Sequence, residues 1–235
     1  MNGITNVAID AFVLYSDEKT TLVTLKQLKE EPLIGEIYVM MQGKESCPYM
    51  GCEVIRVDDF RSSSTVRKIA EKLKASFALL CTAQTPITFG YQAISRMCSV
   101  ANSVDPALVY ADRYVVKNGE TVKSPTMDFY YGSVRDDFDF GPVMLFSAPT
   151  LQKYVEEFPD ADYTYSGLYD LQLFSLRRKR QAALFHIREF LYTEEEKDLR
   201  TSGEKQFDYV NPRNREVQKE REIVCTKHLK LIGSY

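Results

Sequence analysis

The sequence is poor in the residues that build redox and metal centres. Among 235 residues it has no tryptophan, two histidines and five cysteines. Five is an odd number, and Cys47 and Cys52 lie too far apart for a C-x-x-C motif. We therefore expect free thiols, with neither a structural disulfide nor a zinc site.

Long hydrophobic runs and processing signals are also missing. No stretch reaches the ~18 consecutive apolar residues of a membrane-spanning helix, and the N-terminus lacks a charged segment followed by an apolar one. A cytoplasmic protein is expected on these grounds. No glycine-rich loop with a basic residue follows the first predicted strand, which disfavours a nucleotidyltransferase.

Neither sign of charge is in large excess. Thirty Lys and Arg residues stand against 33 Asp and Glu residues, giving a net charge of −3. This balance gives no general attraction to phosphate backbones, so no nucleic-acid partner is expected. The one basic run, 177–180, is interpreted as a solvated helix end. The remaining composition, 44% hydrophobic and 27% charged, is typical of a folded α/β domain of this length.

Apolar runs alternate with amphipathic segments through the first half of the chain. Leu22, Leu25 and Leu28 share a helical face, Ser62 begins another helix, and a third is expected from about Gly90 with Tyr91 on its inner side. This order predicts an α/β fold with a mixed, mostly parallel sheet and helices on both faces. The predicted strands are 7–14, 36–41, 52–57, 77–80, 107–110 and, later, 182–191; a hairpin turn is expected at 117–120 and a final helix from 211.

Polar residues follow the strands at one predicted edge of the sheet. Ser16 and Asp17 follow the first strand, Gln42 the second, Asp58 the third, and Thr82 and Gln84 the fourth. Because open α/β sheets bind ligands at the carboxyl ends of their strands, we expect a cleft there. Asp112 ends the fifth strand, where it either contacts a ligand or caps a neighbouring helix.

With its Tyr165–Asp170 segment, this order of elements resembles the GT-A fold of family 2 glycosyltransferases, including a Bacteroidetes-type subgroup. The resemblance implies an inverting transfer from a nucleotide-diphospho-sugar to a carbohydrate or glycolipid acceptor, as in polysaccharide biosynthesis. It divides the single domain, 1–235, into a nucleotide-sugar-binding half (1–112), an acceptor-side half (113–210) and a C-terminal helix (211–235). The implied donor-binding residues are Ser16, Asp17, Gln42, Asp58, Thr82, Gln84, Asp112 and Arg188.

The metal motif of that family is missing. The family carries aspartates after the fourth strand, where this chain has Thr82-Ala83-Gln84. Mg²⁺ and Mn²⁺ prefer carboxylate oxygens, so these neutral residues are weak ligands. Either Asp112 or the group Asp136, Asp137 and Asp139 supplies the carboxylates, or the ligand binds without a metal; the sequence favours the latter.

Asp170 is the catalytic base that the resemblance implies. It lies at the head of a predicted helix, as does the acidic residue that deprotonates the acceptor in the family. We expect its carboxylate to face the cleft near Asp112 or the acidic loop. A carboxylate in a first helical turn is also favoured by the helix dipole alone, so a structural role stays open.

The acidic loop offers acceptor-binding residues. Asp137 and Asp139 flank Phe138 and would project to one side of an extended segment, where they could bind sugar hydroxyls or face solvent. His186 is expected to be a satisfied strand histidine, and His228 a surface residue. The competing function is a catalytically weak binding or scaffold domain, and the resemblance allows a second transferase-like domain to follow.

Overall fold

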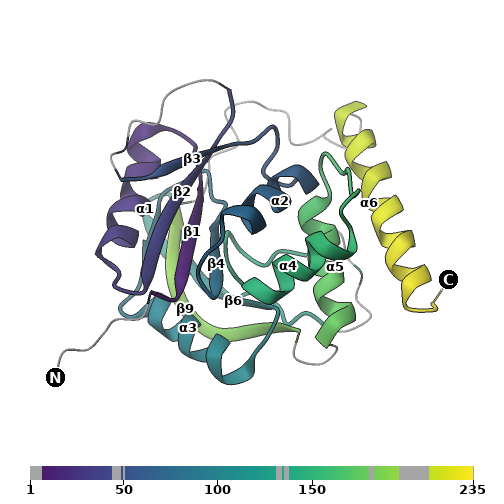
Figure 1. Cartoon of the computed structure of the whole chain (residues 1–235). Coiled ribbons are helices and arrows are strands. Elements are labelled where there is room, and N and C mark those ends of the chain that lie inside the picture. Colours follow the sequence, from purple (N-terminus) through teal and green to yellow (C-terminus); the bar gives the residue numbers. More distant parts are fainter. Residues whose placement is uncertain are drawn as a thin grey trace.

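A single twisted sheet forms the centre of the molecule (Figure 1). The computed structural model describes residues 7–43, 49, 51–130, 134, 138–179, 183–195 and 212–234. Within these residues, nine strands make one sheet in the order β3-β2-β1-β4-β8-β6-β9-β5, and β7 pairs with β6. The strands are β1 Ile9–Leu14, β2 Ile34–Met41, β3 Glu53–Arg56, β4 Phe77–Cys81, β5 Ile87–Phe89, β6 Leu108–Lys117, β7 Glu120–Ser124, β8 Val143–Ser147 and β9 Leu184–Glu195.

The first four strands in the sheet order are mutually parallel, as the sequence predicts. β1 pairs in parallel with β2 and β4, and β2 pairs in parallel with β3. The second half is mixed: β8 is antiparallel to β4 and β6, whereas β9 is parallel to β6. The carboxyl ends of β1, β2, β3 and β4 therefore meet at one edge of the sheet.

Helices cover both faces of the sheet. They are α1 Glu18–Glu30, α2 Ser63–Lys72, α3 Ala93–Val104, α4 Ala148–Glu157, α5 Gly167–Lys179 and α6 Pro212–Leu231. Alternation along β1 sends Ala11 and Val13 into the core beneath α1 and α3, and Phe12 and Leu14 into the core beneath α2, α4 and α5. Both faces are apolar because both are buried.

Local signals set the helix starts that the sequence predicts. The Asp17 side chain accepts a hydrogen bond from Thr20 N (2.9 Å) at the start of α1. Ser62 does the same for Thr65 N (3.1 Å) at the start of α2. Each cap satisfies a backbone N–H that would otherwise lack a partner.

Three elements were not expected from the sequence: β5, α4 and the antiparallel strand β8. β8 is a short buried run, Val143–Ser147, with no alternation to mark it. The predicted strand 107–110 also continues to Lys117 as β6. The expectation for Tyr91 was wrong, because its side chain is 93% exposed just before α3 begins.

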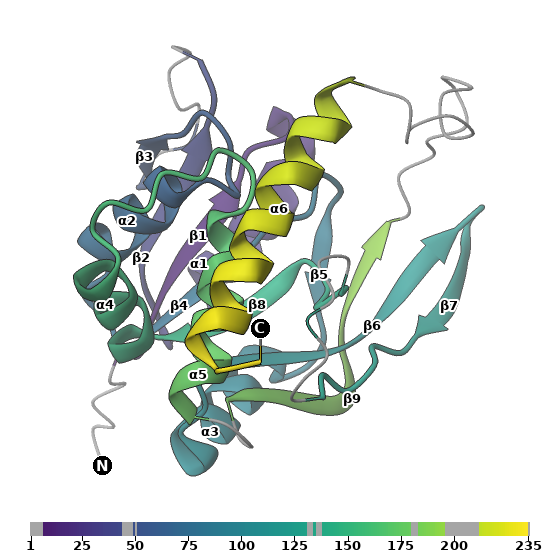
Figure 2. The same cartoon turned by 90° about the vertical axis from the view of Figure 1, so that its right-hand side faces the viewer.

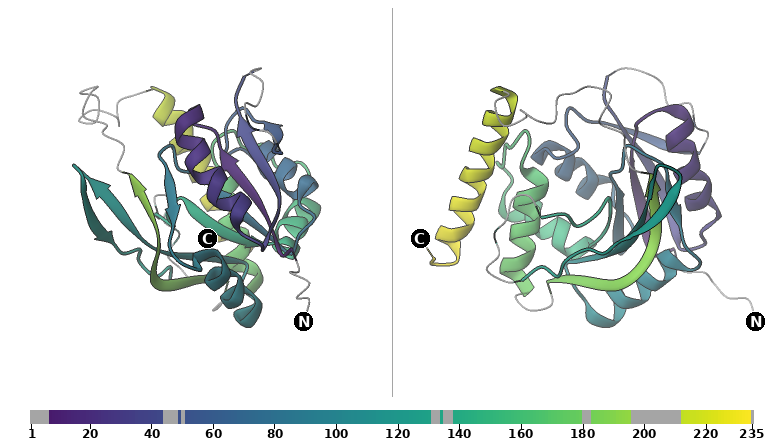
Figure 3. Two further views of the ribbon diagram at one scale, coloured as in Figure 1. Left: turned by 90° about the vertical axis from the view of Figure 1, so that its left-hand side faces the viewer. Right: turned by 180° about the vertical axis from the view of Figure 1, so that it is seen from behind.

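The C-terminal helix runs along α5 (Figure 2). Val224 of α6 is fully buried against Tyr169, Leu173 and Leu176 of α5. The β6–β7 hairpin projects from the far side of the sheet, and β9 curves past α3 (Figures 2 and 3). No helix in the described part of the chain is long and apolar enough to cross a bilayer. Cys52, Cys81, Cys98 and Cys225 are free thiols.

Candidate functional site

A pocket lies at the edge where the four parallel strands end. Its volume is about 410 Å³, and we call it the strand-end pocket. Residues following β1, β2, β3 and β4 all contribute to it, which is the placement that the sequence predicts for a ligand cleft. The lining residues are Leu14, Tyr15, Ser16, Gln42, Gly43, Asp59, Phe60, Arg61 and Gln84.

Three of the sequence-derived donor residues meet in this pocket. Ser16, Gln42 and Gln84 come from three separate loops. Ser16 Oγ donates to the Gln84 carbonyl (2.9 Å), and Gln42 Nε2 donates to the Asp58 carbonyl (2.7 Å). These bonds tie neighbouring loops together around the opening. Asp17, by contrast, has its carboxylate engaged as the cap of α1, and the Thr20 hydrogen bonds lower its pKa.

An ion pair forms one wall of the strand-end pocket. Arg61 donates to Asp59 through both Nε (2.9 Å) and Nη2 (2.7 Å), and its guanidinium carbon lies 5.7 Å from the centre of the Tyr165 ring. The hydrogen bond to Asp59 raises the pKa of Arg61. Burial would raise the pKa of Asp59, but the hydrogen bonds from Arg61 outweigh it and hold that pKa below its usual value.

Sequence reasoning missed both members of this pair and selected Asp58 instead. Asp58 is exposed and contributes its carbonyl to Gln42, whereas the next residue, Asp59, lines the pocket. The sequence did contain a signal for this pair: Asp58 and Asp59 directly follow a predicted strand, and Arg61 lies two residues after Asp59. Only the turn geometry decides which aspartate faces inward.

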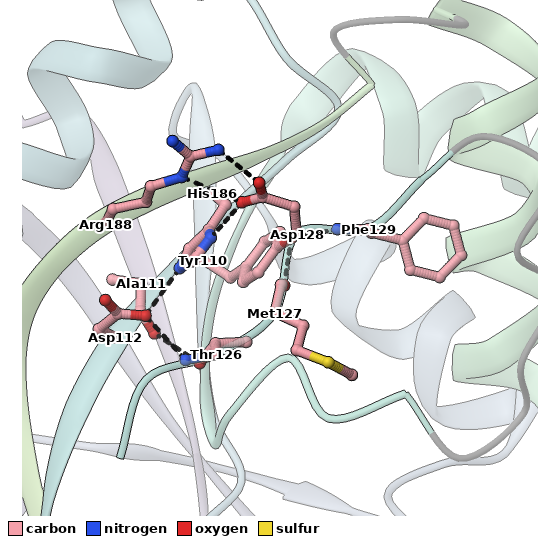
Figure 4. Close-up of polar contacts among 9 residues, drawn as sticks. All are labelled: Tyr110, Ala111, Asp112, Thr126, Met127, Asp128, Phe129, His186 and Arg188. Atoms are coloured by element: carbon pink, nitrogen blue, oxygen red, sulfur yellow. Dashed lines mark hydrogen bonds and ion pairs between the residues drawn. The ribbon is translucent and has the colours of Figure 1, made fainter. Parts of the chain in front are cut away.

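Asp112 and Arg188 belong to a different cluster, shown in Figure 4. His186 lies between two carboxylates: its Nε2 is 2.8 Å from Asp112 Oδ1 and its Nδ1 is 2.7 Å from Asp128 Oδ1. Arg188 forms an ion pair with Asp128. The Arg188 and His186 hydrogen bonds lower the pKa of Asp128 to about 2. Both ring nitrogens of His186 are therefore engaged, in agreement with the expected satisfied strand histidine.

This cluster adjoins a second pocket, of about 640 Å³, between α3 and β9. Asp128, His186 and Arg188 line it, and no described residue lines both this pocket and the strand-end pocket. Asp112 is held by His186 and also accepts a hydrogen bond from Thr126 N (2.8 Å). The structure thus separates Asp112 and Arg188 from Ser16, Gln42 and Gln84, with which the sequence grouped them.

The acidic loop is described only in part. Asp136 and Asp137 lie outside the described residues. Asp139 accepts from Arg113 Nη2 (2.6 Å) and from Gly141 N (2.8 Å), and Arg113 also binds Glu194 through Nε (2.7 Å). Thr82 N donates to the Pro142 carbonyl (2.8 Å), which fixes the end of this loop beside the end of β4.

The described donors do not fit a carboxylate-bound divalent cation. Thr82 and Gln84 are neutral, and the carboxylates proposed to replace the missing motif, those of Asp112 and Asp139, are each bound to a basic side chain. Within the described ranges, no three His, Cys, Asp or Glu residues are placed to hold a metal ion.

Asp170 does not face a cleft, and that expectation is wrong. Its side chain has no exposed surface. It accepts hydrogen bonds from Lys227 Nζ (2.8 Å) and Tyr154 OH (3.1 Å), and Arg177 Nη2 lies 4.0 Å away. The cause is α6, which covers α5 and brings Lys227 over the carboxylate.

Two further expectations fail for the same reason. His228 is buried, not on the surface, and its Nδ1 lies 3.0 Å from Arg177 Nη1. Arg177 itself, in the basic run read as a solvated helix end, has a side chain only 12% exposed. The packing of α6 on α5 therefore encloses a group of charged and polar residues, which we call the α5–α6 network: Tyr154, Asp170, Arg177, Lys227 and His228.

No protein-family model and no curated protein sequence matches the chain. Solved structures do resemble it. TarS of S. aureus, residues 1–349, aligns with a TM-score of 0.54 at 10% identity over 79% of this chain and 60% of TarS. The same protein in complex with UDP-GlcNAc gives 0.54 at 10% identity, over 81% and 59%. A mycobacterial protein gives 0.59 at 10% identity, over 93% and 75%.

These similarities identify the fold. The mixed α/β sheet with helices on both faces is the fold that the sequence predicts, and it is the GT-A fold that the resemblance implies. The chain spans about 60% of the TarS structures that it resembles.

Proposed function

We propose that this chain is a glycosyltransferase domain that binds a nucleotide-diphospho-sugar in the strand-end pocket. The observation that carries the proposal is the convergence of Ser16, Gln42 and Gln84 with the Asp59–Arg61 pair at the ends of four parallel strands. The GT-A fold and the UDP-GlcNAc bound by the similar TarS support a uridine nucleotide as the first ligand to test.

The pocket offers chemistry suited to a nucleoside diphosphate. Ser16, Gln42 and Gln84 supply hydroxyl and amide groups that can donate to and accept from a base or ribose. Arg61 supplies a guanidinium with donors left over after it binds Asp59. The Tyr165 ring and the Asp59 carboxylate already hold the Arg61 guanidinium in place, so binding a phosphate costs little side-chain entropy.

The transfer itself is proposed to invert the anomeric carbon. An acceptor hydroxyl oxygen bonds to that carbon as the bond to the diphosphate oxygen breaks, and the hydroxyl proton passes to a base. The nucleoside diphosphate leaves with the bonding electrons, and its developing charge lies beside Arg61. We assign acceptor binding to the loop that carries Asp137 and Asp139, as the sequence suggests. We also propose that the chain is a single domain of family 2 and of its Bacteroidetes-type subgroup.

A second candidate function is favoured by the position of Asp170. A fully buried carboxylate bound to Lys227 and Tyr154 has no access to an acceptor hydroxyl. This observation supports a domain that binds nucleotide sugars but transfers weakly, acting as the scaffold of a larger transferase. Measuring donor binding and sugar transfer on the same preparation separates the two candidates.

Substituting Arg61 by glutamine is expected to weaken UDP binding about tenfold. The change removes the cation from the pocket wall. The Asp59 carboxylate then loses the cation beside it and repels an anionic ligand. Isothermal titration of UDP into the wild type and the variant, after a thermal-shift panel of nucleoside diphosphates and their sugars with and without Mn²⁺, measures the effect.

Arg188→Gln is the matched control. Arg188 also pairs with an aspartate, but it lines the pocket between α3 and β9. Its substitution is expected to leave the affinity for UDP unchanged. If Arg188→Gln weakened UDP binding and Arg61→Gln did not, the donor would bind in the other pocket and the proposal would be wrong.

A further inference from the structure

One side chain of the C-terminal helix, Glu220, holds the backbone just before α5. Its carboxylate accepts hydrogen bonds from two consecutive backbone amides, Thr164 N (2.8 Å) and Tyr165 N (2.6 Å). Consecutive N–H groups that converge on one carboxylate fix the backbone direction, because both oxygens are used at once. Glu220 thereby holds the segment 163–168, which leads into α5; we call it the α5 entry segment.

The opposite side of the α5 entry segment rests on the start of α2. Ser63 N donates to the Tyr163 carbonyl (2.8 Å), and Leu168 N donates to the Arg61 carbonyl (2.9 Å). Gly167 packs so closely that a Cβ there would lie 2.2 Å from Ser63 N, so no larger residue fits without moving the backbone. The segment is clamped between α2 on one side and Glu220 on the other.

The clamped segment carries the ring that supports the pocket wall. Tyr165 receives one of the two Glu220 hydrogen bonds, and its ring centre lies 5.7 Å from the guanidinium carbon of Arg61. The Asp59 hydrogen bond is the main cause of the raised pKa of Arg61, and the charge of Glu220 adds to it. Glu220 therefore acts on Arg61 both through the backbone of Tyr165 and through its own charge.

We infer that Glu220 is a positioning residue for the strand-end pocket: docking of α6 sets the α5 entry segment, which places Tyr165 and so orients Arg61 towards a nucleoside diphosphate. This inference rests on the function proposed for that pocket. It assigns to α6, none of whose described side chains lines the pocket, a part in ligand affinity.

Three variants test the inference. Glu220→Gln keeps the size of the side chain but replaces one acceptor oxygen by a donor that faces a backbone N–H. Glu222→Gln is the matched control, since Glu222 is exposed and lies two residues along the same helix, on another face. Tyr165→Leu removes the ring and keeps the backbone amide.

At a temperature where circular dichroism shows all variants folded, Glu220→Gln is expected to weaken UDP binding about fivefold, the effect of one to two ordinary hydrogen bonds. Amide hydrogen exchange at Thr164 and Tyr165 should accelerate, and the NMR signal of Arg61 Nε–H should shift. Glu222→Gln should change none of these. In the Tyr165→Leu background, Glu220→Gln should weaken UDP binding much less, because its main route to Arg61 is gone; a general loss of stability would instead add in full.

The outcomes separate this inference from the proposed function. A wild type that binds UDP, together with a Glu220→Gln variant that binds it equally well, overturns the inference alone. A wild type that binds no nucleoside diphosphate overturns the proposed function. In that case the Arg61 Nε–H signal still decides the positioning role: a shift in Glu220→Gln and not in Glu222→Gln supports it, and an unchanged signal overturns it.

Discussion

Asp170→Asn is expected to lower the free energy of unfolding by about 3–5 kcal/mol, the usual cost of removing one partner from a buried ion pair. The asparagine fills the same space, but Lys227 and Arg177 lose the only carboxylate that the described residues place against them in the α5–α6 network. Tyr154 OH would also have to donate to an amide oxygen in place of a carboxylate oxygen. Urea denaturation followed by circular dichroism measures the change, with an unchanged slope expected because the folded state exposes no new surface.

The double variant Asp170→Leu with Lys227→Met distinguishes the cost of an unpaired buried charge from the cost of altered packing. Replacing both partners of a buried pair by apolar residues of similar size is often close to neutral, so the part of the loss that comes from the unpaired Lys227 should return. The part that comes from Arg177 and Tyr154 OH should remain, because both still lack the carboxylate. The opposite pattern would also be decisive. If Asp170→Asn were as stable as the wild type and had lost sugar transfer, the carboxylate would act on the acceptor, and the base role inferred from the sequence would be restored.

The outcome for Asp170 shows where sequence reasoning stops. Its helix was predicted correctly, because Ser166-Gly167 and an acidic first turn are local signals. What surrounds the side chain depends on Lys227, 57 residues later in the chain, and no local pattern announces such a pairing. A carboxylate at the head of a helix looks the same in sequence whether it faces a cleft or the underside of another helix.

The parallel half of the sheet was the most predictable part, for a physical reason. β1 and β4 are buried on both faces, and α1 and α2 begin at side-chain caps, so these elements leave strong marks in the sequence. The ends of parallel strands must also meet at one edge, which is why Ser16, Gln42 and Gln84 line one pocket. Asp112 and Arg188 were grouped with them wrongly, because β6 and β9 lie beyond the antiparallel strand β8 in the sheet order.

Lowering the pH from about 6.5 to about 4 is expected to remove roughly 3 kcal/mol of stability through His228 alone. Burial is the main cause that lowers the pKa of His228 to about 4, and the positive charge of Arg177 adds to it. Since arginine can only donate, Nδ1 of His228 must be the acceptor of the 3.0 Å contact, and the neutral ring is the form that fits. Between pH 6.5 and 4, His228 is protonated in the unfolded chain but neutral in the folded chain, so the free energy of unfolding falls as the pH falls. Below about pH 4 His228 is protonated in both states, and this loss is complete.

His228→Leu isolates the effect from the titration of carboxylates in the same range. Leucine is accepted by a site that is 2% exposed, and it does not titrate, so the variant should lose less stability than the wild type between pH 6.5 and 4. Chemical denaturation of both proteins at half-unit pH steps gives the difference curve, which should rise with pH over that window and be flat above it. Parallel curves for the two proteins would show that folding does not lower the pKa of His228, and would therefore contradict its burial beneath α6. In that event the close packing of α6 on α5, on which the Asp170 prediction also depends, would not describe the protein in solution.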